Sequence, residues 1–164
     1  IINEGVEKVI INSINFENKN LINEIANKFG SQSVIVSIDV KKIDNDYKIF
    51  SNNGQTQKNI NLFEYLKQIQ DSGAGEIILT SIDREGTKLG LDFELYSIVE
   101  KYVNIPLIAH GGVNNTENII NFFDNFSFSA VSCGKIFVFY GSRDAVLINY
   151  PDEVSIEKIM SKYE

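Results

Sequence analysis

Short runs of valine, isoleucine and leucine alternate along this chain with longer segments in which apolar residues recur at helical spacing. Runs this apolar are typical of strands that are covered on both faces, as in parallel sheets flanked by helices. The pattern predicts five such strands, at residues 8–12, 33–40, 76–81, 106–111 and 130–134. It predicts helices at residues 19–28, 61–71, 93–102 and 116–124. We therefore expect repeated βα units around a parallel sheet.

Two segments depart from this alternation. Residues 43–59 have alternating apolar and polar positions and the turn-forming pair Asn53-Gly54, so they predict a hairpin excursion between a strand and its helix. After residue 150, apolar residues again fall at helical spacing and favour a closing helix. These residues are Ile156, Ile159 and Met160.

Composition and charge narrow the class of protein. The 164 residues are 43% hydrophobic, which is enough for one sizeable core and fits a single domain or a large part of one. The chain has 15 basic and 22 acidic residues, and its net charge of -7 argues against nucleic acid or a membrane as a partner. The single cysteine, Cys133, excludes an internal disulfide, and no apolar run approaches the roughly 20 residues of a membrane-spanning helix. A cytoplasmic protein is the default expectation.

The positions of the glycines distinguish two folds that both contain five parallel βα units, an open doubly wound sheet and part of a barrel. A nucleotide-binding open sheet usually carries Gly-x-Gly-x-x-Gly after its first strand, whereas residues 12–16 contain no glycine. Glycines follow the last two predicted strands instead, as Gly111, Gly112 and Gly134. In a TIM barrel, the loops after the seventh and eighth strands commonly bind phosphate. We therefore expect strands four to eight of a (β/α)8 barrel, an interpretation that agrees with a first residue other than methionine.

Two predicted strands end in the same three residues, Ser-Ile-Asp, at positions 37–39 and 81–83. The carboxyl ends of parallel barrel strands line the active site, so Asp39 and Asp83 are expected to project into one mouth and exchange protons with a substrate. An aspartate after a strand also commonly caps the next helix or turn, and this structural role is the alternative for both residues.

Three stretches resemble one enzyme family, the cyclase subunit of imidazole glycerol phosphate synthase, or HisF family. They are FGSQSVIVSIDVKK at 29–42, GAGEIILTSIDREGTKLGLD at 73–92 and PLIAHGGV at 106–113. The resemblance covers nearly the whole chain and implies that residues 1–164 are the C-terminal part of a single (β/α)8 barrel domain. It also implies a glutaminase partner of the HisH type, whose ammonia passes through the barrel. There a phosphorylated ribulose-type substrate is cleaved and cyclised to imidazole glycerol phosphate, in histidine biosynthesis. The interpretation includes neither a metal nor a cofactor.

The resemblance also implies roles for individual residues. Asp39 matches the second of the family's two acid/base aspartates, of which the first lies on strand one, and Asp83 borders the substrate. The implied substrate- and phosphate-binding residues are Asn12, Ser13, Thr80, His110, Gly111, Gly112, Gly134 and Lys135. At the N-terminal face, Lys8 and Glu76 match two members of the charged ring that admits ammonia. An ordinary solvated ion pair is the alternative for these two.

Three residues differ from the usual family pattern. His110, the sole histidine, stands where a small hydroxyl residue is usual, and it is either a substrate contact or an ordinary histidine. Lys135 stands where the family tends to carry serine, and it either pairs with a phosphate or extends to solvent. Glu85 replaces an aspartate, which is a milder difference.

The segment at 135–151 also differs from the usual cyclase tail. It is closer to paralogues found in surface-sugar gene sets, which the resemblance associates with ammonia delivery for acetamidino modification of a sugar. Three functions therefore stay open. They are a histidine-pathway cyclase, an ammonia-conducting subunit of a sugar-amidating complex, and a non-catalytic fragment of a longer enzyme.

A barrel that lacks its first three strands has physical consequences. Each outermost strand keeps an unpaired edge, so the isolated chain is expected to self-associate. It is also expected to be inactive in cyclisation, because one acid/base aspartate and one phosphate loop are absent. Cys133 is expected to be a small buried hydrophobe without a chemical role.

Overall fold

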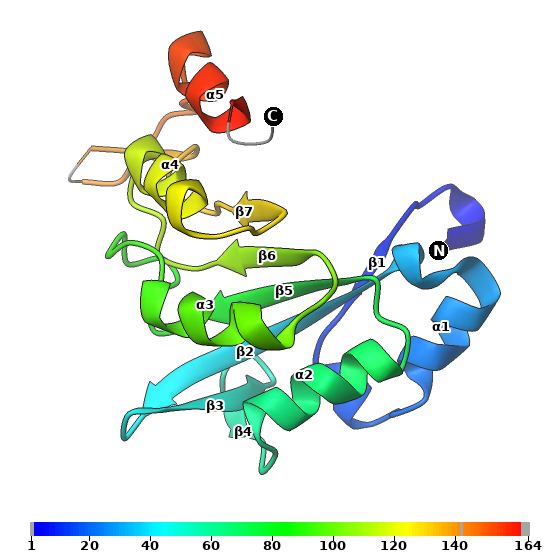
Figure 1. Ribbon diagram of the computed structural model, residues 1–164. Helices are drawn as coiled ribbons and strands as arrows, with labels where there is room; N and C mark the ends of the chain where they lie inside the picture. The colour runs from blue at the N-terminus through cyan, green and yellow to red at the C-terminus, as the bar shows by residue number, and fades with distance from the viewer. Residues whose placement is uncertain (1, 142, 162–164) are drawn as a thin grey trace.

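The computed structural model describes residues 2–141 and 143–161 and contains one main sheet with helices packed against it (Figure 1). Five strands run parallel in the spatial order β1, β2, β5, β6, β7. Their bounds are Val9–Ile11, Val34–Ile43, Glu76–Ser81, Leu107–His110 and Ala130–Ser132. The predicted α/β fold with a parallel sheet is confirmed.

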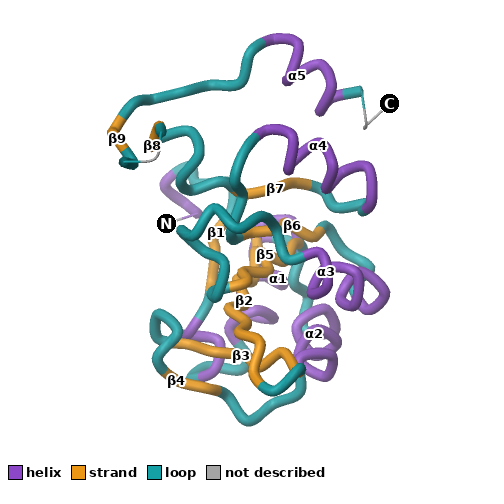
Figure 2. Tube along the Cα trace, turned by 90° about the vertical axis from the view of Figure 1, so that its left-hand side faces the viewer, coloured by secondary structure: helices purple, strands orange, loops and turns teal. Residues whose placement is uncertain are grey.

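The helices follow the strands in alternation, as the hydrophobic pattern predicts. They are α1 (Leu21–Phe29), α2 (Leu62–Asp71), α3 (Phe93–Val99), α4 (Thr116–Asn125) and α5 (Glu153–Met160). Short 3-10 turns lie at Ile2–Glu4, Ser13–Phe16, Ser31–Ser33 and Glu100–Tyr102. Figure 2 shows the strands as a narrow column with α2, α3 and α4 on one side of it. Helices α2 to α5 each begin at a side chain that accepts hydrogen bonds from backbone N–H groups of the first turn, namely Asn61, Asp92, Asn115 and Asp152.

Alternation along the strands gives the sheet two different faces. The helix-covered face is almost dry: the four side chains that β2 contributes to it are at most 1% exposed. These side chains are Val34, Val36, Ile38 and Val40, and the same core contains Ile77, Leu79, Leu107 and Ala109 from the neighbouring strands. The opposite face, here called the second face, carries the intervening residues, among them Ser37 and Asp39 of β2. Helices bury only one side of this sheet.

Strand β2 continues beyond its parallel part into an antiparallel extension. It pairs with β3 (Asp46–Ser51), which in turn pairs with β4 (Thr56–Gln57). Asp44 and Asn45 have φ values of 49° and 64°, as the type I′ turn of a two-residue hairpin requires. The Asn53-Gly54 pair forms the second turn, between β3 and β4. Next to it, the backbone N–H of Asn52 donates a hydrogen bond of 2.8 Å to Ser13 Oγ, so the turn between β3 and β4 contacts the segment after β1.

The tail after β7 contains a hairpin that the pattern did not predict. Strands β8 (Phe139–Tyr140) and β9 (Ala145–Val146) form a separate two-stranded antiparallel sheet. The predicted closing helix is present as α5, and Ile159 packs against the core, but Ile156 and Met160 stay 43% and 59% exposed. Within the residues that the structure describes, no helix combines the length and the apolar character that crossing a membrane requires.

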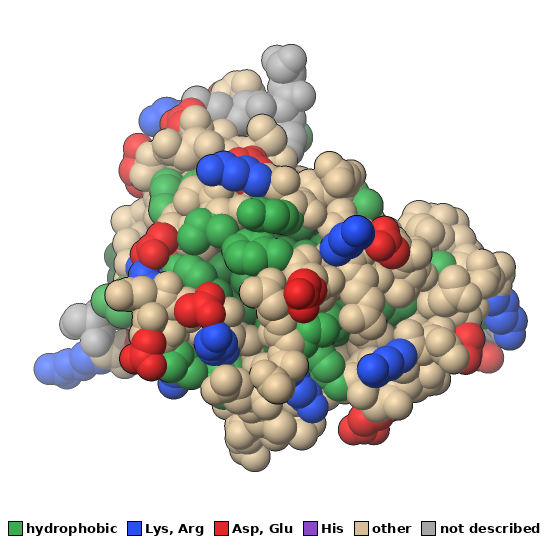
Figure 3. All heavy atoms as spheres, turned by 60° about the horizontal axis from the view of Figure 1, so that its bottom comes forward, with side chains coloured by type: hydrophobic (Ala, Val, Ile, Leu, Met, Phe, Trp, Pro, Cys, Tyr) green, Lys and Arg blue, Asp and Glu red, His purple; other side chains and the backbone are tan. Residues whose placement is uncertain are grey.

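Both outer edges of the parallel sheet lack a strand partner within the described residues. Strand β1 pairs only with β2, and β7 pairs only with β6. Ile10 of β1 is in register with Ile35 on the second face and is 60% exposed. Figure 3 shows the face of the molecule seen from below, where hydrophobic side chains gather near the middle among scattered charges.

Candidate functional site

Four neighbouring strands carry polar side chains at the same level near their carboxyl ends. The register pairs Asp39 with Thr80 and Thr80 with His110. It then pairs His110 with Ser132. Paired residues of neighbouring parallel strands point to the same face, so these four side chains, here called the polar row, lie on the second face. With adjacent strands about 4.8 Å apart, the polar row extends over roughly 14 Å.

At one end of the polar row, an amide positions the Asp39 carboxylate. Asn12 Nδ2, directly after β1, donates hydrogen bonds of 3.1 Å to Asp39 Oδ2 and 3.4 Å to Ser37 Oγ. Ser13 Oγ donates to Asn12 Oδ1 at 3.3 Å, and it accepts from Asn52 N in the turn between β3 and β4. The expected residues Asn12, Ser13 and Asp39 are thus brought together, and a carboxylate held at one oxygen keeps the other for proton exchange.

In the middle of the polar row, His110 lies between a hydroxyl and a carboxylate. Its Nδ1 is 3.2 Å from Thr80 Oγ1, and its Nε2 is 3.3 Å from Glu85 Oε2. Its backbone is fixed by Tyr96, whose hydroxyl donates to His110 O at 2.7 Å and accepts from His110 N at 3.1 Å. Burial raises the pKa of Tyr96, so this hydroxyl stays a neutral donor. His110 is therefore a positioned imidazole on the face that carries Asp39.

Beyond His110, the chain passes through Gly111 and Gly112, with φ values of 107° and 89°. A Cβ on Gly112 would lie 2.4 Å from Gly90 O, and the N–H of Gly90 donates a 2.7 Å hydrogen bond to Gly112 O. The glycines are thus required by the close approach of the β5–α3 and β6–α4 loops. They line a hollow of about 10 Å³, here called the glycine pocket, together with Gly134, Lys88 and Lys135. Such a volume holds about one water molecule.

Lys135 does not extend freely into solvent. Its Nζ lies 2.8 Å from Asp144 Oδ2 and donates a 2.9 Å hydrogen bond to Gly86 O. Its side chain is only 27% exposed. Its ionic partner within the described residues is thus Asp144, which is neither a phosphate nor solvent.

Asp83 lies apart from the polar row. It follows β5, three residues beyond Thr80, and its Oδ2 accepts a 3.0 Å hydrogen bond from the N–H of Lys42. Its Oδ1 is 3.5 Å from Lys41 Nζ. These contacts attach the loop after β5 to the extension of β2, a structural role different from capping the next helix or turn. The structure does not bring Asp83 into contact with Asp39.

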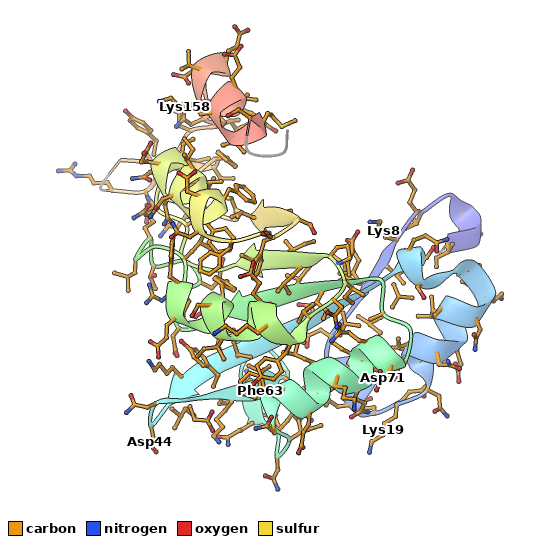
Figure 4. All side chains as sticks on the ribbon, viewed as in Figure 1. Lys8, Lys19, Asp44, Phe63, Asp71 and Lys158 are labelled. Carbon is orange, nitrogen blue, oxygen red and sulfur yellow. The ribbon has the colours of Figure 1, made fainter. Side chains whose placement is uncertain are left out.

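Lys8 and Glu76 form an ion pair at the opposite end of the sheet. Glu76 is in register with Ile35 at the start of β5, four residues before Thr80, and the two-residue period places it on the second face. Figure 4 shows Lys8 where β1 begins. Side-chain exposures of 41% and 19% leave the pair accessible to water. The second face thus has a charged pair at one end and the polar row at the other.

Several residues of this region were not singled out from the sequence, and Asp92 is the most connected of them. It is 5% exposed and caps α3 by accepting from the N–H of Leu95 at 3.2 Å. It also accepts from Ser81 Oγ at 3.0 Å and from Tyr47 Oη at 3.1 Å, and Arg84 Nε lies 3.6 Å away. Its position directly before a helical segment is an N-cap signal that the sequence does contain. The other residues missed were Ser132, Lys88 and Asp144.

Metal-ligating side chains and the single cysteine are two further features to place in this geometry. Among the described residues, no three histidine, cysteine, aspartate or glutamate side chains cluster in a way that suits a metal ion. Cys133 packs partly buried against the core, and burial together with the charge of Glu85 raises the pKa of its thiol to about 11. A thiol of this kind is a poor nucleophile at neutral pH.

Comparison with known proteins gives a consistent set of relatives. The histidine biosynthesis protein family matches residues 1–143. A Sulfolobus acidocaldarius protein named imidazole glycerol phosphate synthase subunit HisF is 44% identical over 120 residues, which are 73% of this chain and 48% of that protein. A Hydrogenobaculum protein of the same name is 42% identical over 140 residues, 85% of this chain and 56% of that protein. A Pseudomonas aeruginosa protein, provisionally named imidazole glycerol phosphate synthase subunit hisF2, is 42% identical over 149 residues, 90% of this chain and 59% of that protein. The chain spans about half to three fifths of the length of these relatives.

Proposed function

This chain belongs to the HisF family of histidine biosynthesis proteins, and from this premise we propose that it is the C-terminal part of a cyclase subunit that uses ammonia to form imidazole glycerol phosphate. In this proposal, its five parallel strands are strands four to eight of an eight-stranded barrel. The share of each relative that the chain spans and the open edges of β1 and β7 support that assignment. The remaining strands would cover the second face.

One observation carries the proposal, namely that the second face has proton-transfer groups at one end and an ion pair at the other. Asp39 and His110 stand in one row at the carboxyl ends of β2 and β6. Lys8 and Glu76 lie at the amino ends of the same sheet. Inside a closed barrel, this face would connect an entrance for ammonia with a reaction site at the opposite mouth.

The proposed roles follow from the positions of the residues. A phosphorylated ribulose-type substrate would bind one phosphoryl group at the glycine pocket and the other near Asn12 and Ser13. Asp39 lies two to three strands from the glycine pocket, roughly 10–14 Å, which such a substrate can span. Asp39 would transfer a proton at the reacting carbons, while Asn12 keeps its carboxylate oriented. A glutaminase partner would supply the ammonia.

A second candidate is an ammonia-conducting subunit that serves the acetamidino modification of a surface sugar. The observation that favours it is the contact between His110 and Glu85, which both differ from the usual cyclase pattern. Because their side chains meet at 3.3 Å, the two differences form one altered feature of the site. An imidazole in place of a small hydroxyl would change which substrate the site accepts.

The test of the cyclase is catalysis by the full-length protein that contains this chain, supplied with the ribulose-type substrate and ammonium ions. We expect turnover to imidazole glycerol phosphate, and we expect Asp39→Asn to lower kcat by about 100-fold or more, the usual contribution of a general acid or base. Asp71→Asn is the matched control, because Asp71 is exposed at the end of α2 (Figure 4).

The outcomes separate the two candidates. Wild-type turnover that Asp39→Asn leaves unchanged would contradict the role of Asp39. A wild-type protein that binds a glutaminase but neither turns over the substrate nor restores growth without histidine to a cyclase-deficient strain would favour the sugar-modifying complex.

A further inference from the structure

The β8–β9 hairpin presents a carboxylate to two lysines of the glycine pocket. Asp144 directly precedes β9, and its Oδ1 lies 2.6 Å from Lys88 Nζ. Its other oxygen, Oδ2, lies 2.8 Å from Lys135 Nζ. Lys88 belongs to the loop after β5 and Lys135 follows β7, so one carboxylate connects three separate segments.

The same two lysines suit a phosphoryl group. They line the glycine pocket beside Gly111, Gly112 and Gly134, where backbone can approach an anion closely, and the Glu85 carboxylate lines it as well. Lysine ammonium groups form strong hydrogen bonds with phosphate oxygens. The hollow is only about 10 Å³, however, which is too small for a phosphoryl group. Asp144 thus engages both cations with two oxygens, as an anionic ligand would, from outside the lining of the pocket.

The ion pairs of Asp144 with Lys88 and Lys135 can form at neutral pH and can be replaced by a competing anion. Hydrogen bonds from Lys135 and then Lys88 lower the pKa of Asp144, so its carboxylate is charged at neutral pH. The side chains of Lys88, Lys135 and Asp144 are 28%, 27% and 42% exposed. Ion pairs this accessible contribute little to stability and are screened by salt. A competing dianion with more oxygen acceptors can therefore take the lysines.

Beyond its base the β8–β9 hairpin is largely exposed, whereas Phe137 at its base packs partly buried against the core. Val146 and Ile148 are 78% and 79% exposed, and Tyr140 is 57% exposed. Its internal backbone hydrogen bonds, Leu147 N to Val138 O and Asn149 N to Phe137 O, keep it a hairpin when it shifts as a unit.

We propose that the β8–β9 hairpin is a lid over the glycine pocket, held closed by Asp144, and that a phosphorylated small molecule opens it by taking Lys88 and Lys135 from that carboxylate. The inference rests on the proposed function for its ligand class. Beyond that function, Asp144 competes with the ligand for the two lysines. This competition lowers the affinity for every phosphorylated ligand and links ligand binding to hairpin movement.

The test uses the full chain and follows backbone amide signals by NMR during titration with inorganic phosphate and, separately, D-ribose 5-phosphate, at constant ionic strength. Asp144→Asn should tighten phosphate binding by about three- to tenfold, as expected when exposed ion pairs are removed. Lys88→Gln should weaken it. In the wild type, phosphate should move the Ala145 and Val146 signals toward their positions in ligand-free Asp144→Asn. Asp44→Asn is the matched control, because Asp44 is exposed and has the same φ of 49° as Asp144. It should leave phosphate binding and the hairpin signals unchanged.

The possible failures are distinguishable. Phosphate that shifts the Gly111 and Gly112 signals but not the hairpin, or that binds Asp144→Asn no better than wild type, would overturn the lid and leave the phosphate site in place. If phosphate shifted no signal in any variant, both the lid and the phosphate site of the proposed function would be refuted.

Discussion

His110 has a polar partner for each of its two ring nitrogens. The imidazole has two nitrogens that need polar partners in a half-buried site. Thr80 meets Nδ1 across the neighbouring strand, and Glu85 meets Nε2 from the loop after β5. With the two side chains 25% and 40% exposed, their contact is accessible to water, so it orients the imidazole and contributes little to the stability of the fold.

Asp92 is predicted to be the most important polar side chain for stability in the loop after β5. Asp92→Ala removes the N-cap of α3 and leaves the buried hydroxyls of Ser81 and Tyr47 without their acceptor. A lost cap costs about 1 kcal/mol, and each unpaired buried hydroxyl adds about 1 kcal/mol or more, so we expect a loss of about 3 kcal/mol. Urea unfolding measures it. Asp71→Ala, at an exposed position, should change the free energy of unfolding by less than about 0.5 kcal/mol, and similar values for the two variants would contradict the prediction.

Cys133 is predicted to be nearly inert toward thiol reagents in the folded chain. Burial raises the pKa of its thiol from 9.0 to about 11, which lowers the reactive thiolate fraction at pH 7 by about 100-fold. The labelling rate should rise about tenfold per pH unit between pH 7 and 10, since only the thiolate reacts. The folded state holds this proton more tightly than the unfolded chain. The contribution of the group to stability is thus complete below about pH 9 and is lost as pH rises toward 11.

Labelling with an iodoacetamide reagent, with the urea-unfolded chain as reference, measures this difference. Cys133→Ser gives the background rate. Equal labelling rates for folded and unfolded protein at pH 7 would show that the thiol is accessible and that its pKa is not raised.

Which site residues the sequence predicts depends on the distance over which they interact. The place of Asp39 near the carboxyl end of β2 was predictable, because it needs only local pattern and strand direction. The partner of His110 was not, since Glu85 lies 25 residues away and meets it only through the folded loop after β5. Asp83 followed the same sequence rule as Asp39, yet the extension of β2 supplies Lys42 N as its partner. A local motif gives a residue's place on a strand, whereas its chemical neighbours come from tertiary structure.

The loops after β5 and β6 act as one unit, and Gly112 is where they meet. Gly112→Ala is predicted to destabilise the chain by about 2 kcal/mol more than Gly86→Ala, because the new Cβ would lie 2.4 Å from Gly90 O and break the Gly90–Gly112 hydrogen bond. Gly86 is the matched control: its φ of 73° is also positive, but an added Cβ there meets nothing within 4 Å. Equal losses in urea unfolding would mean that backbone strain alone matters at both glycines.

At the level of whole elements, the pattern predicted the strands and helices that are long enough to show periodicity, and it missed the shortest strands. The parallel strands and their helices follow from long apolar runs and helical periodicity, which the core at Val36 and Leu79 explains. The first turn of the excursion uses Asp44-Asn45 rather than an Asn-Gly pair, so the turn signal pointed to the second turn instead. Strands β8 and β9 have two residues each, and no periodicity can be read from two positions.

The whole molecule exposes more surface than a compact chain of its size. Its accessible surface is 9623 Å², whereas a compact monomer of 18.5 kDa exposes about 8,200 Å². The difference, about 1,400 Å², is of the order of the surface that a stable protein–protein interface buries. Part of it lies in the exposed tail, and part lies on the second face, where Ile10 is 60% exposed beside an unpaired strand edge. The excess surface therefore favours association, and the tail and the second face are the two regions where it could be buried.

We predict that the isolated chain self-associates through its open sheet edges at micromolar concentration, because β1 and β7 present unpaired backbone groups next to apolar side chains. Light scattering coupled to size exclusion should show a dimer or larger species. Ile10→Lys, which places a charge on the β1 edge, should shift the population toward monomer, since charged residues on edge strands block strand pairing. Ile14→Lys is the matched control, because Ile14 is 46% exposed but lies outside the strands. A monomeric wild type would contradict the prediction, and so would an oligomer that Ile148→Lys in the tail dissociates while Ile10→Lys does not.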